Sequence, residues 1–374
     1  MRLAFFCHSL VSDWNHGNAH FLRGVVRELL ARGHEVRVFE PRDGWSRENL
    51  RREHGARPFE EFDRFFPELR AVLYDPHDFD AEAAIDGAEL VLVHEWNDPA
   101  VVRRIGQVRA RSAHFRLLFH DTHHRSVTAP RSMGHYDLRH YDGALAYGDV
   151  IRDLYLERGW VDEAWTWHEA ADARLFRPLP SAERRDTIVW IGNWGDNERT
   201  SELYEFLIEP VWSLRLRGEA YGVRYPDEAC RALAGAGLEY GGWLANHRVP
   251  EVYARHGVTV HIPRRPYAHA LPGIPTIRPF EALACGIPLV TAPWDDVEGL
   301  FTPGADFLVA RNGREMRAHL RAVLEDHELA RSLAQHGRQT ILGRHTCAHR
   351  VDELLAIAAQ LGLDVVTPAA AEAR

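Results

Sequence analysis

One segment in the second half of the chain has residue types that could hold an anion. It reads Leu271-Pro-Gly-Ile-Pro-Thr-Ile-Arg-Pro-Phe-Glu-Ala-Leu-Ala-Cys-Gly-Ile-Pro-Leu-Val290, which predicts a turn, a helix and then a strand. The backbone N–H groups at the start of a helix lie at the positive end of its dipole, which suits a diphosphate. Arg278 could add a bidentate contact, and Glu281 could accept both hydroxyl groups of a ribose. Spacing alone fits equally well with a surface helix that has Arg278 in solvent.

A second polar segment, Leu117-Leu-Phe-His-Asp-Thr-His-His124, ends a predicted strand in the first half. At the carboxyl end of a parallel strand, His120 would face a ligand site, with Asp121 and His123 as further candidates. Histidine and aspartate also bind metals, so a metal site is an alternative. Neighbours one residue apart rarely converge on one ion, and the helical HExxH spacing is missing. We therefore expect no metal; a purely structural histidine remains the other alternative.

Two further segments of the first half follow predicted strands. In Ser12-Asp-Trp-Asn-His-Gly-Asn-Ala-His20, Gly17 would allow close backbone approach, while Asn18 and His20 would supply polar contacts. His94-Glu-Trp-Asn97 ends another strand, where Trp96 could stack on a sugar or simply be buried. No GxGxxG spacing occurs, which disfavours a nicotinamide site. Candidates for the side of a second substrate are His20, His94, Trp96 and His123.

The amino-acid composition excludes some kinds of catalytic and binding site. The chain has no lysine, so all 45 basic residues are arginine, and a lysine Schiff base or a Walker lysine is excluded. Any diphosphate must be held by arginine, backbone N–H groups or a helix N-terminus. The net charge of -9 argues against nucleic-acid binding. The four cysteines are scattered without CxxC spacing, and neither a signal peptide nor a membrane-spanning run is evident, so we expect reduced thiols and a cytoplasmic protein.

Strand and helix patterns alternate along the whole chain, which predicts two doubly wound α/β domains. Such tandem Rossmann-like halves place a ligand cleft between the carboxyl ends of two sheets. Periplasmic binding proteins, epimerases and glycosyltransferases all use this layout, so it does not choose a function. We expect a first domain at 1–178, a linker at 179–186, a second domain at 187–345, and a helix and tail at 346–374 that pack back toward the first domain.

The motif residues resemble a known family. The segment 281–288, which includes the end of the helix expected at 278–285, is similar to the E-A-x-A-x-G-x-P donor-site signature of family-4-type retaining glycosyltransferases. With the preceding arginine, and with Pro293-Trp-Asp-Asp-Val-Glu-Gly-Leu-Phe301, it is more similar to CgeB-like (spore-maturation-type) glycosyltransferases. The resemblance implies a GT-B fold and a donor loop formed by Gly273, Ile274, Pro275 and Thr276. It implies that Glu281 grips the donor ribose. The wider family has a glutamate where this chain has Gly273.

The resemblance extends over most of residues 1–360. It implies that the loop with Gly17 and Asn18 lies over the donor phosphates and that His120 contacts the donor sugar. In Trp190-Ile-Gly-Asn-Trp-Gly-Asp-Asn-Glu-Arg199, Asn193 replaces one basic residue of the family and Arg199 substitutes for the other. Arg264 and Arg265 are alternatives. Asp172, Phe176 and Pro178 match the family's interdomain hinge.

These patterns predict a glycosyltransferase that takes a sugar from a nucleotide sugar, for which we expect a UDP-sugar. We expect the reaction to need no metal or other cofactor and to retain the configuration of the sugar. A non-catalytic relative that binds nucleotide or sugar is an alternative, because Gly273 replaces a glutamate. An epimerase of nucleotide sugars is a second alternative. The acceptor stays open among carbohydrate, protein, lipid and small metabolite, as does the oligomeric state.

Overall fold

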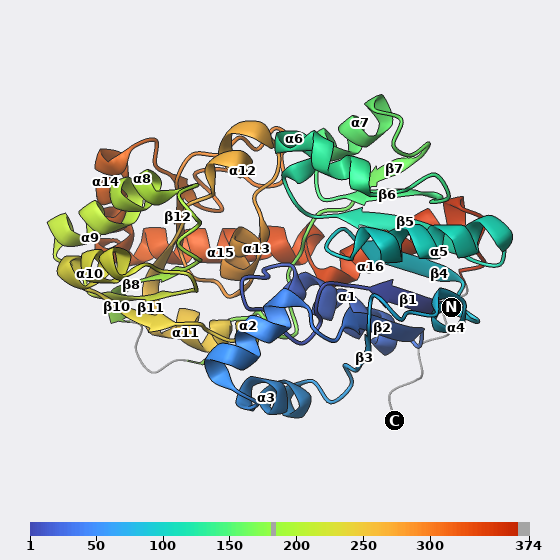
Figure 1. The fold of residues 1–374 in the computed structure, drawn as a ribbon. Helices are drawn as coiled ribbons and strands as arrows, with labels where there is room; N and C mark the ends of the chain where they lie inside the picture. Colours follow the sequence, from blue (N-terminus) through green and yellow to red (C-terminus); the bar gives the residue numbers. More distant parts are fainter. Residues whose placement is uncertain (181–184, 366–374) are drawn as a thin grey trace, which may run out of the picture. The chain divides into compact units, whose positions relative to one another are not determined.

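The computed structural model describes residues 1–180 and 185–365. The contacts divide the chain into two compact units (Figure 1). Unit 1 comprises Met1–Glu169 and the described residues from Cys347 on, and unit 2 comprises Ala170–Thr346. Half of the linker expected at 179–186, residues 181–184, lies outside the described residues, as does the tail from 366. The second domain's first strand begins at Arg185, two residues before the expected position.

Unit 1 contains a seven-stranded sheet in the order β3-β2-β1-β4-β5-β6-β7, and all neighbouring strands are parallel. Every residue of β4 and β6 is buried, as expected when helices cover both faces of a parallel sheet. The strands are β1 (Arg2–Phe6), β2 (Glu35–Pro41), β3 (Ala71–Tyr74), β4 (Leu90–His94), β5 (Arg116–Asp121), β6 (Gly143–Ala146) and β7 (Ala164–Thr166).

The helix at the end of the chain, α16 (Cys347–Gln360), belongs to unit 1 and packs beside α1 (Ala19–Ala31). Figure 1 shows this red helix next to the blue one. Arg32 forms an ion pair with Asp352, and the Trp167 indole donates a hydrogen bond to the Arg350 carbonyl oxygen (2.8 Å). The other helices of unit 1 are α2 (Trp45–His54), α3 (Arg57–Phe65), α4 (Ala81–Ile85), α5 (Pro99–Arg111), α6 (Arg125–Thr128), the 3-10 turn η1 (Pro130–His135) and α7 (Asp149–Glu157).

Unit 2 contains a six-stranded sheet in the order β10-β9-β8-β11-β12-β13, again with parallel neighbours. Its core joins Trp190 and Val260 of the central strands to helix residues such as Leu207, Leu233 and Leu320. The strands are β8 (Arg185–Ile191), β9 (Gly218–Tyr221), β10 (Leu238–Gly242), β11 (His256–His261), β12 (Leu289–Thr291) and β13 (Leu308–Val309).

The helix expected at 200–216 is interrupted. It begins as α8 (Thr200–Leu203), widens into the π-helical turn η2 (Tyr204–Ile208) and ends as α9 (Glu209–Leu214). Pro210 lacks the N–H that an α-helix needs there, which accounts for the change in hydrogen-bond register. The remaining helices are α10 (Asp227–Ala236), η3 (Asn246–Arg248), α11 (Val249–Arg255), α12 (Arg265–Ala270), α13 (Ile277–Ala284), α14 (Gly313–Glu325) and α15 (His327–Arg344).

The two sheets have the same strand order in chain terms: the third, second, first, fourth, fifth and sixth strands lie side by side. In unit 1, the strands from β1 to β3 extend the sheet toward one edge and those from β4 to β7 toward the other, so the switch point lies between β1 and β4. In unit 2 the switch point lies between β8 and β11. In such sheets, ligands bind at the carboxyl ends of the strands that flank this switch point. Among the described helices, none is both long and apolar enough to cross a membrane.

Candidate functional site

Arg199 lies at the switch point of unit 2, at the end of the loop that follows β8. Its side chain is buried, donates hydrogen bonds to the carbonyl oxygens of Ile262 (2.8 Å) and Asn193, and lies 5.1 Å from the Trp190 ring centroid. Within the described part of the chain, its Nε has no hydrogen-bond partner. All the bonds that hold this guanidinium therefore go to neutral groups, which leaves its buried charge available to an anion.

Other arginines raise the positive potential around Arg199. Burial, together with the positive charges of Arg264 and Arg278, lowers the pKa of Arg199 to about 9. Arg264 is paired with Glu198 at 3.2 Å, and Arg278 is paired with Glu281. The three guanidinium groups thus carry three positive charges, against the two negative charges of Glu198 and Glu281. The site has an excess positive charge in a buried setting, where a bound anion is strongly favoured.

The loop before α13 has a strained backbone. Gly273 has a φ of +90°, and Thr276, a β-branched residue that disfavours positive φ, has a φ of +62° at the start of the helix. The Thr276 side chain makes no capping hydrogen bond. The first N–H groups of α13 have no partners within the helix, and strain of this kind clusters at ligand sites. Ile274 and Pro275 are buried beneath the loop.

Glu281 and Arg278 are not the solvent-exposed pair that a surface helix would give. Glu281 is fully buried; its Oε1 accepts a hydrogen bond from the Asn246 amide (2.7 Å), and its other oxygen pairs with Arg278. The surface-helix alternative is therefore wrong. The sequence did not single out Asn246, and no local pattern could link it to a helix 35 residues away. A direct ribose contact by Glu281 stays a prediction.

His261, the last residue of β11, is a second polar residue at this switch point that sequence reasoning missed. Its Nδ1 lies 2.9 Å from the Thr291 hydroxyl, which itself donates to the Ala292 carbonyl oxygen (2.8 Å). This assigns the ring proton to Nδ1. Nε2 is then an acceptor, and it is buried without a partner among the described residues. Burial, with the charges of Arg199 and Arg278, lowers the pKa of His261 to about 3.

In unit 1, the loop after β1 is held firmly. Glu40 accepts hydrogen bonds from Ser9 Oγ (3.0 Å) and the Leu10 backbone (2.6 Å), and Arg23 of α1 donates to the Leu10 carbonyl oxygen (2.7 Å). Gly17 is exposed at the end of this loop. The Asn18 amide donates to Glu169 (3.2 Å), while its Oδ1 is buried and has no partner in the described part. His20 is buried on α1.

Four buried imidazoles form a row at the switch point of unit 1. Adjacent ring centroids lie 5.0 Å apart for His8 and His16, 6.2 Å for His16 and His94, and 5.2 Å for His94 and His120. The Nε2 atoms of His8, His16 and His120 have no hydrogen-bond partner among the described residues, whereas His94 Nε2 lies 2.9 Å from Thr122 Oγ1. Sequence reasoning missed His8 and His16, because the strand-end signal marks only His94 and His120.

Burial keeps these imidazoles neutral. It lowers the pKa of His8 to about 4 and that of His120 to about 3, and it lowers the pKa values of His16 and His94 as well. A neutral imidazole has one donor and one acceptor nitrogen, which matches a hydroxyl group. The His120 ring also contacts the Trp167 ring, at a centroid separation of 4.9 Å.

Two buried carboxyl groups lie next to this row. Glu95, which the sequence did not single out, pairs with Arg125 at 2.7 Å; Asp121 accepts hydrogen bonds from the Tyr155 hydroxyl (2.9 Å) and the His123 backbone (3.0 Å). Burial, and then the charge of Asp121, raises the pKa of Glu95 to about 8, and burial raises the pKa of Asp121. Neighbours on a strand point to opposite faces, so Asp121 does not share the side of His120. Its catalytic role stays a prediction.

Aromatic rings lie at the more open end of the row. Trp96 is partly exposed; its ring centroid is 4.1 Å from the Arg125 guanidinium carbon, 5.0 Å from the His123 ring and 6.0 Å from the His8 ring. The alternative of a buried tryptophan is therefore wrong for Trp96, whose side chain is half-buried. Indole faces beside hydroxyl-binding imidazoles suit a sugar or a similar ligand.

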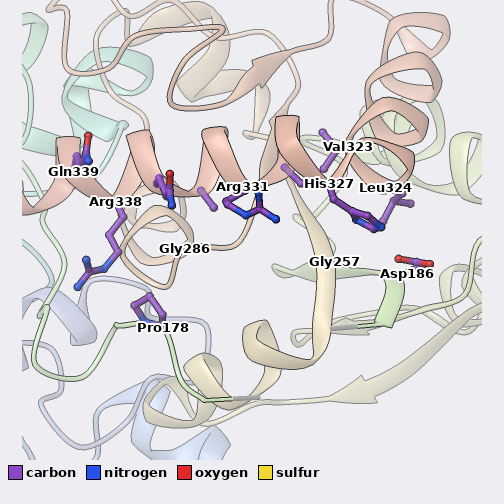
Figure 2. Close-up of a pocket in the computed structure, with 13 residues that line it drawn as sticks. Pro178, Asp186, Gly257, Gly286, Val323, Leu324, His327, Arg331, Arg338 and Gln339 are labelled. Atoms are coloured by element: carbon purple, nitrogen blue, oxygen red, sulfur yellow. The ribbon is translucent and has the colours of Figure 1, made fainter. Parts of the chain in front are cut away.

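Among the described residues, no group of three or more histidine, cysteine, aspartate or glutamate side chains has an arrangement that could hold a metal ion. A separate cavity of about 710 Å³ lies in unit 2, lined by α15 residues, Asp186 and Gly257. Figure 2 shows Arg338 extending from α15 toward Pro178. Asp186 and Gly257 start β8 and β11, so this cavity lies at the amino edge of the sheet, away from Arg199 and His261.

Comparison with known proteins agrees with both halves of the fold. Residues 198–356 match a family model described as glycosyl transferase-like. The fold is similar to a glycosyltransferase from Rickettsia africae (11% identity, 97% of this chain and 99% of that chain, TM-score 0.67). It is similar to Anabaena HepE in complex with UDP and glucose (12% identity, 96% of this chain and 100% of that chain, TM-score 0.67). It is also similar to sucrose-phosphate synthase from Thermosynechococcus elongatus (15% identity, 96% of this chain and 99% of that chain, TM-score 0.63). No curated protein sequence matches.

These matches confirm the predicted fold class: the chain has the GT-B fold of nucleotide-sugar glycosyltransferases, with one parallel α/β sheet in each unit. The prediction of a glycosyltransferase agrees with the family-model match and with these structural neighbours. The matched segment begins at Glu198 and includes Arg199 and the whole of α13.

Proposed function

We propose that the protein transfers a sugar from a UDP-sugar to an acceptor hydroxyl, with the donor bound mainly by unit 2 and with no divalent metal. The observation that carries this proposal is Arg199, a buried guanidinium whose hydrogen bonds to the described residues all go to carbonyl oxygens. UDP as the nucleotide is supported by the UDP in the HepE complex. The resemblance supports membership of the CgeB-like group and retention of configuration.

The diphosphate has three sources of positive potential in unit 2. These are Arg199, Arg278 and the backbone N–H groups at the start of α13, and they are held before the ligand arrives. Fixed donors aimed at the leaving diphosphate stabilise the charge that develops when the glycosidic bond breaks. They supply what a divalent cation supplies elsewhere, which is our reason for proposing metal independence. We assign Asn246, which donates a hydrogen bond to Glu281, to the nucleoside side of the donor site.

The row of neutral imidazoles in unit 1 would serve the sugar and the acceptor. Hydroxyl groups can both donate to and accept from an imidazole, so the partnerless Nε2 atoms of His8, His16 and His120 match such a ligand. We assign His120 the role of orienting the transferred sugar and stabilising positive charge near its anomeric carbon. Its lowered pKa argues against a role as a charged acid at neutral pH.

Nucleotide binding tests the proposal directly. The protein is titrated calorimetrically with UDP, GDP, dTDP and ADP, each with and without EDTA, as wild type, Arg199→Met and Arg321→Met. Arg321 is a matched control because it lies in the same unit and is exposed on α14. We expect UDP binding that survives EDTA, is lost in Arg199→Met and is kept in Arg321→Met. Equal binding in all three proteins, or none in wild type, contradicts the proposal.

Turnover separates the transferase from its alternatives. A transferase releases UDP from a UDP-sugar, slowly to water and faster with an acceptor, whereas an epimerase changes the sugar and leaves the UDP-sugar intact. A non-catalytic relative binds UDP and does neither. Incubation with UDP-glucose, UDP-galactose and UDP-N-acetylglucosamine, followed by chromatography of nucleotides, distinguishes the three outcomes.

A further inference from the structure

The cavity of about 710 Å³ beside α15 lies within unit 2 and apart from the proposed donor site. Every described residue that lines it belongs to unit 2. It lies at the amino edge of the sheet, whereas Arg199 and His261 lie at the carboxyl edge. A volume of this size is in the range of cavities that hold small molecules. The cavity therefore has room for a ligand of its own, besides the donor.

One face of α15 supplies most of the polar groups of the cavity. Residues three or four apart on a helix lie on the same face, and the polar lining residues of α15 have this spacing. They are Arg331, Gln335, Arg338 and Gln339. The other face of the helix consists of the buried Leu333, Gly337 and Ile341. The sequence of α15 thus directs two guanidinium groups and two amides to the cavity and an apolar stripe to the core.

Arg338 is the group in the cavity that most directly indicates a ligand. Its Nε is buried and has no hydrogen-bond partner among the described residues. None of the described carboxylates forms an ion pair with its guanidinium group, whereas Arg331 pairs with Glu328. A buried N–H group without an acceptor costs free energy, and an anion bound in the cavity would remove that cost.

The charges along the cavity suit an elongated ligand with an anionic group at one end. Figure 2 shows Arg338 and Asp186 at opposite ends, with Arg331 between them. An arginine binds a phosphate group through two parallel N–H···O hydrogen bonds. The amides of Gln335 and Gln339 can both donate and accept hydrogen bonds, and the Asp186 carboxylate accepts them, as hydroxyl groups require. A phosphate at Arg338 and hydroxyl groups toward Asp186 would match this arrangement.

The rest of the lining distinguishes between ligands that carry a phosphate. Val323, Leu324 and Pro178 supply aliphatic surface, on which the C–H bonds of a sugar ring can pack. None of the described lining residues is tryptophan, tyrosine or phenylalanine. A nucleobase gains much of its binding free energy from stacking on such rings. The lining therefore favours a sugar phosphate over a nucleotide.

The cavity also contacts the helix that begins at the proposed diphosphate site. Gly286, which lines the cavity, donates its N–H to the Leu283 carbonyl oxygen at the end of α13 (3.0 Å). A Cβ atom built on Gly337, the neighbour of Arg338, would lie 2.6 Å from Leu283 Cδ2, so α15 and α13 are tightly packed there. Helix α13 thus connects the cavity, at its carboxyl end, with the proposed diphosphate site at its amino end.

We propose that the α15 cavity is a second ligand site, which binds a sugar phosphate and thereby changes the affinity of unit 2 for the donor nucleotide. Arg338 binds the phosphate group, and Gln335 and Gln339 bind hydroxyl groups of the sugar. The effect on the donor passes through α13. The cavity site is independent of the proposed function, whereas its effect on the donor rests on that function.

Calorimetric titration with glucose 1-phosphate, glucose 6-phosphate, fructose 6-phosphate and glucose tests the site. The proteins are wild type, Arg338→Met, Gln335→Trp, which fills the cavity without removing a charge, and Arg199→Met, which removes the cation of the proposed donor site. Arg231→Met is a matched control, because Arg231 is exposed on α10, which does not line the cavity.

We expect at least one sugar phosphate to bind wild type, Arg199→Met and Arg231→Met with affinities within about twofold of one another. It should bind roughly tenfold more weakly, a loss equivalent to about 1.4 kcal/mol, to Arg338→Met and to Gln335→Trp. Glucose, which lacks the phosphate, should bind none of the proteins measurably. UDP is then titrated with and without a saturating amount of that sugar phosphate. Its affinity should change by at least about threefold in wild type and stay constant in Arg338→Met.

The outcomes separate this inference from the proposed function. Sugar phosphates that bind none of the proteins, or that bind Arg338→Met and Gln335→Trp as tightly as wild type, overturn the cavity site. Binding that is lost in Arg199→Met and kept in Arg338→Met also overturns it, because the ligand would then occupy the donor site. A sugar phosphate that binds in the cavity and leaves UDP affinity unchanged overturns the effect on the donor. A wild type that binds sugar phosphate but no nucleoside diphosphate overturns the proposed function and leaves the cavity site standing.

Discussion

Units 1 and 2 repeat one sheet topology, yet they differ in the side chain that follows the first strand of each sheet, which is a neutral imidazole in unit 1 and a guanidinium in unit 2. The strands that flank the switch point of unit 1 lead to the neutral His8 and His94, whereas those of unit 2 lead to the cationic Arg199 and to His261. The topology sets where a ligand binds, and the side chains decide its chemistry. Unit 2 is suited to an anion, and unit 1 to hydroxyl groups.

The largest expected effect concerns the two buried ion pairs. Glu281→Ala should lower the free energy of unfolding by about 3 kcal/mol, because it leaves Arg278 without its carboxylate and Asn246 without its acceptor. Glu95→Ala in unit 1 should cost less, since the pKa of Glu95 is raised to about 8, so that at pH 7 most of its carboxyl groups are protonated and its charge pairing with Arg125 is weak. Urea unfolding at pH 7 measures both. A greater loss for Glu95→Ala would show that the unit 1 pair is the more stabilising one.

Removing the cation of unit 2 should abolish most nucleotide affinity. Arg199→Met loses two or so charge-assisted hydrogen bonds to phosphate, so UDP should bind roughly 100-fold more weakly. The carbonyl oxygens of Ile262 and Asn193 also lose their donor, so we expect the variant to have a lower melting temperature. The titrations are therefore carried out well below that melting temperature. A loss of less than about fivefold would mean that Arg199 does not touch the diphosphate.

The reciprocal change in unit 1 should affect turnover. His120→Gln should lower kcat for release of UDP from the donor by some tens of fold, because it removes the imidazole that we propose stabilises charge near the anomeric carbon. UDP affinity should stay within about threefold, since the nucleotide is held by unit 2. The measurement is a coupled assay of UDP release beside a UDP titration. A similar loss of UDP affinity in His120→Gln would contradict the division of roles between the units.

The same histidine should also make stability depend on pH. The pKa of His120 is about 3 in the folded protein and 6.5 when unfolded, so the unfolded chain binds more protons below pH 6.5. Stability is therefore lost as pH falls from 6.5 toward 3, by about 2 kcal/mol for this residue between pH 7 and pH 5. His120→Gln should lack this component. The neighbouring Glu95 acts in the opposite sense because its pKa is raised, so the difference between wild type and variant is the quantity to measure.

The regular parts of the fold could be predicted because their patterns are local. The apolar spacing at 19–32 predicts α1, and the apolar run at 90–94 matches β4. Helix α2 was not assigned, since ten residues rich in arginine and glutamate show little apolar period. The break in the helix at 204–208 also went unseen, because propensity alone does not show how Pro210 shifts the hydrogen-bond register.

The site could be predicted only where its residues are close in sequence. Gly273, Arg278 and Glu281 share one turn and helix, so their common location follows from the segment. The contact of Glu281 with Asn246 and that of Gly273 with Glu298 join separate elements, and nothing local indicates them. His8 and His16 were passed over for a related reason: their likeness to His94 and His120 appears only when β1, β4 and β5 lie side by side.

The most direct test of the account is hydrogen exchange of the protein with and without saturating UDP. We expect new protection in the loop 192–199 and at 271–281, with the strongest effect in the first turn of α13. Arg199→Met should lose that protection at the same UDP concentration. Protection confined to unit 1, or located around the α15 cavity, would contradict the assignment of unit 2's carboxyl edge as the donor site.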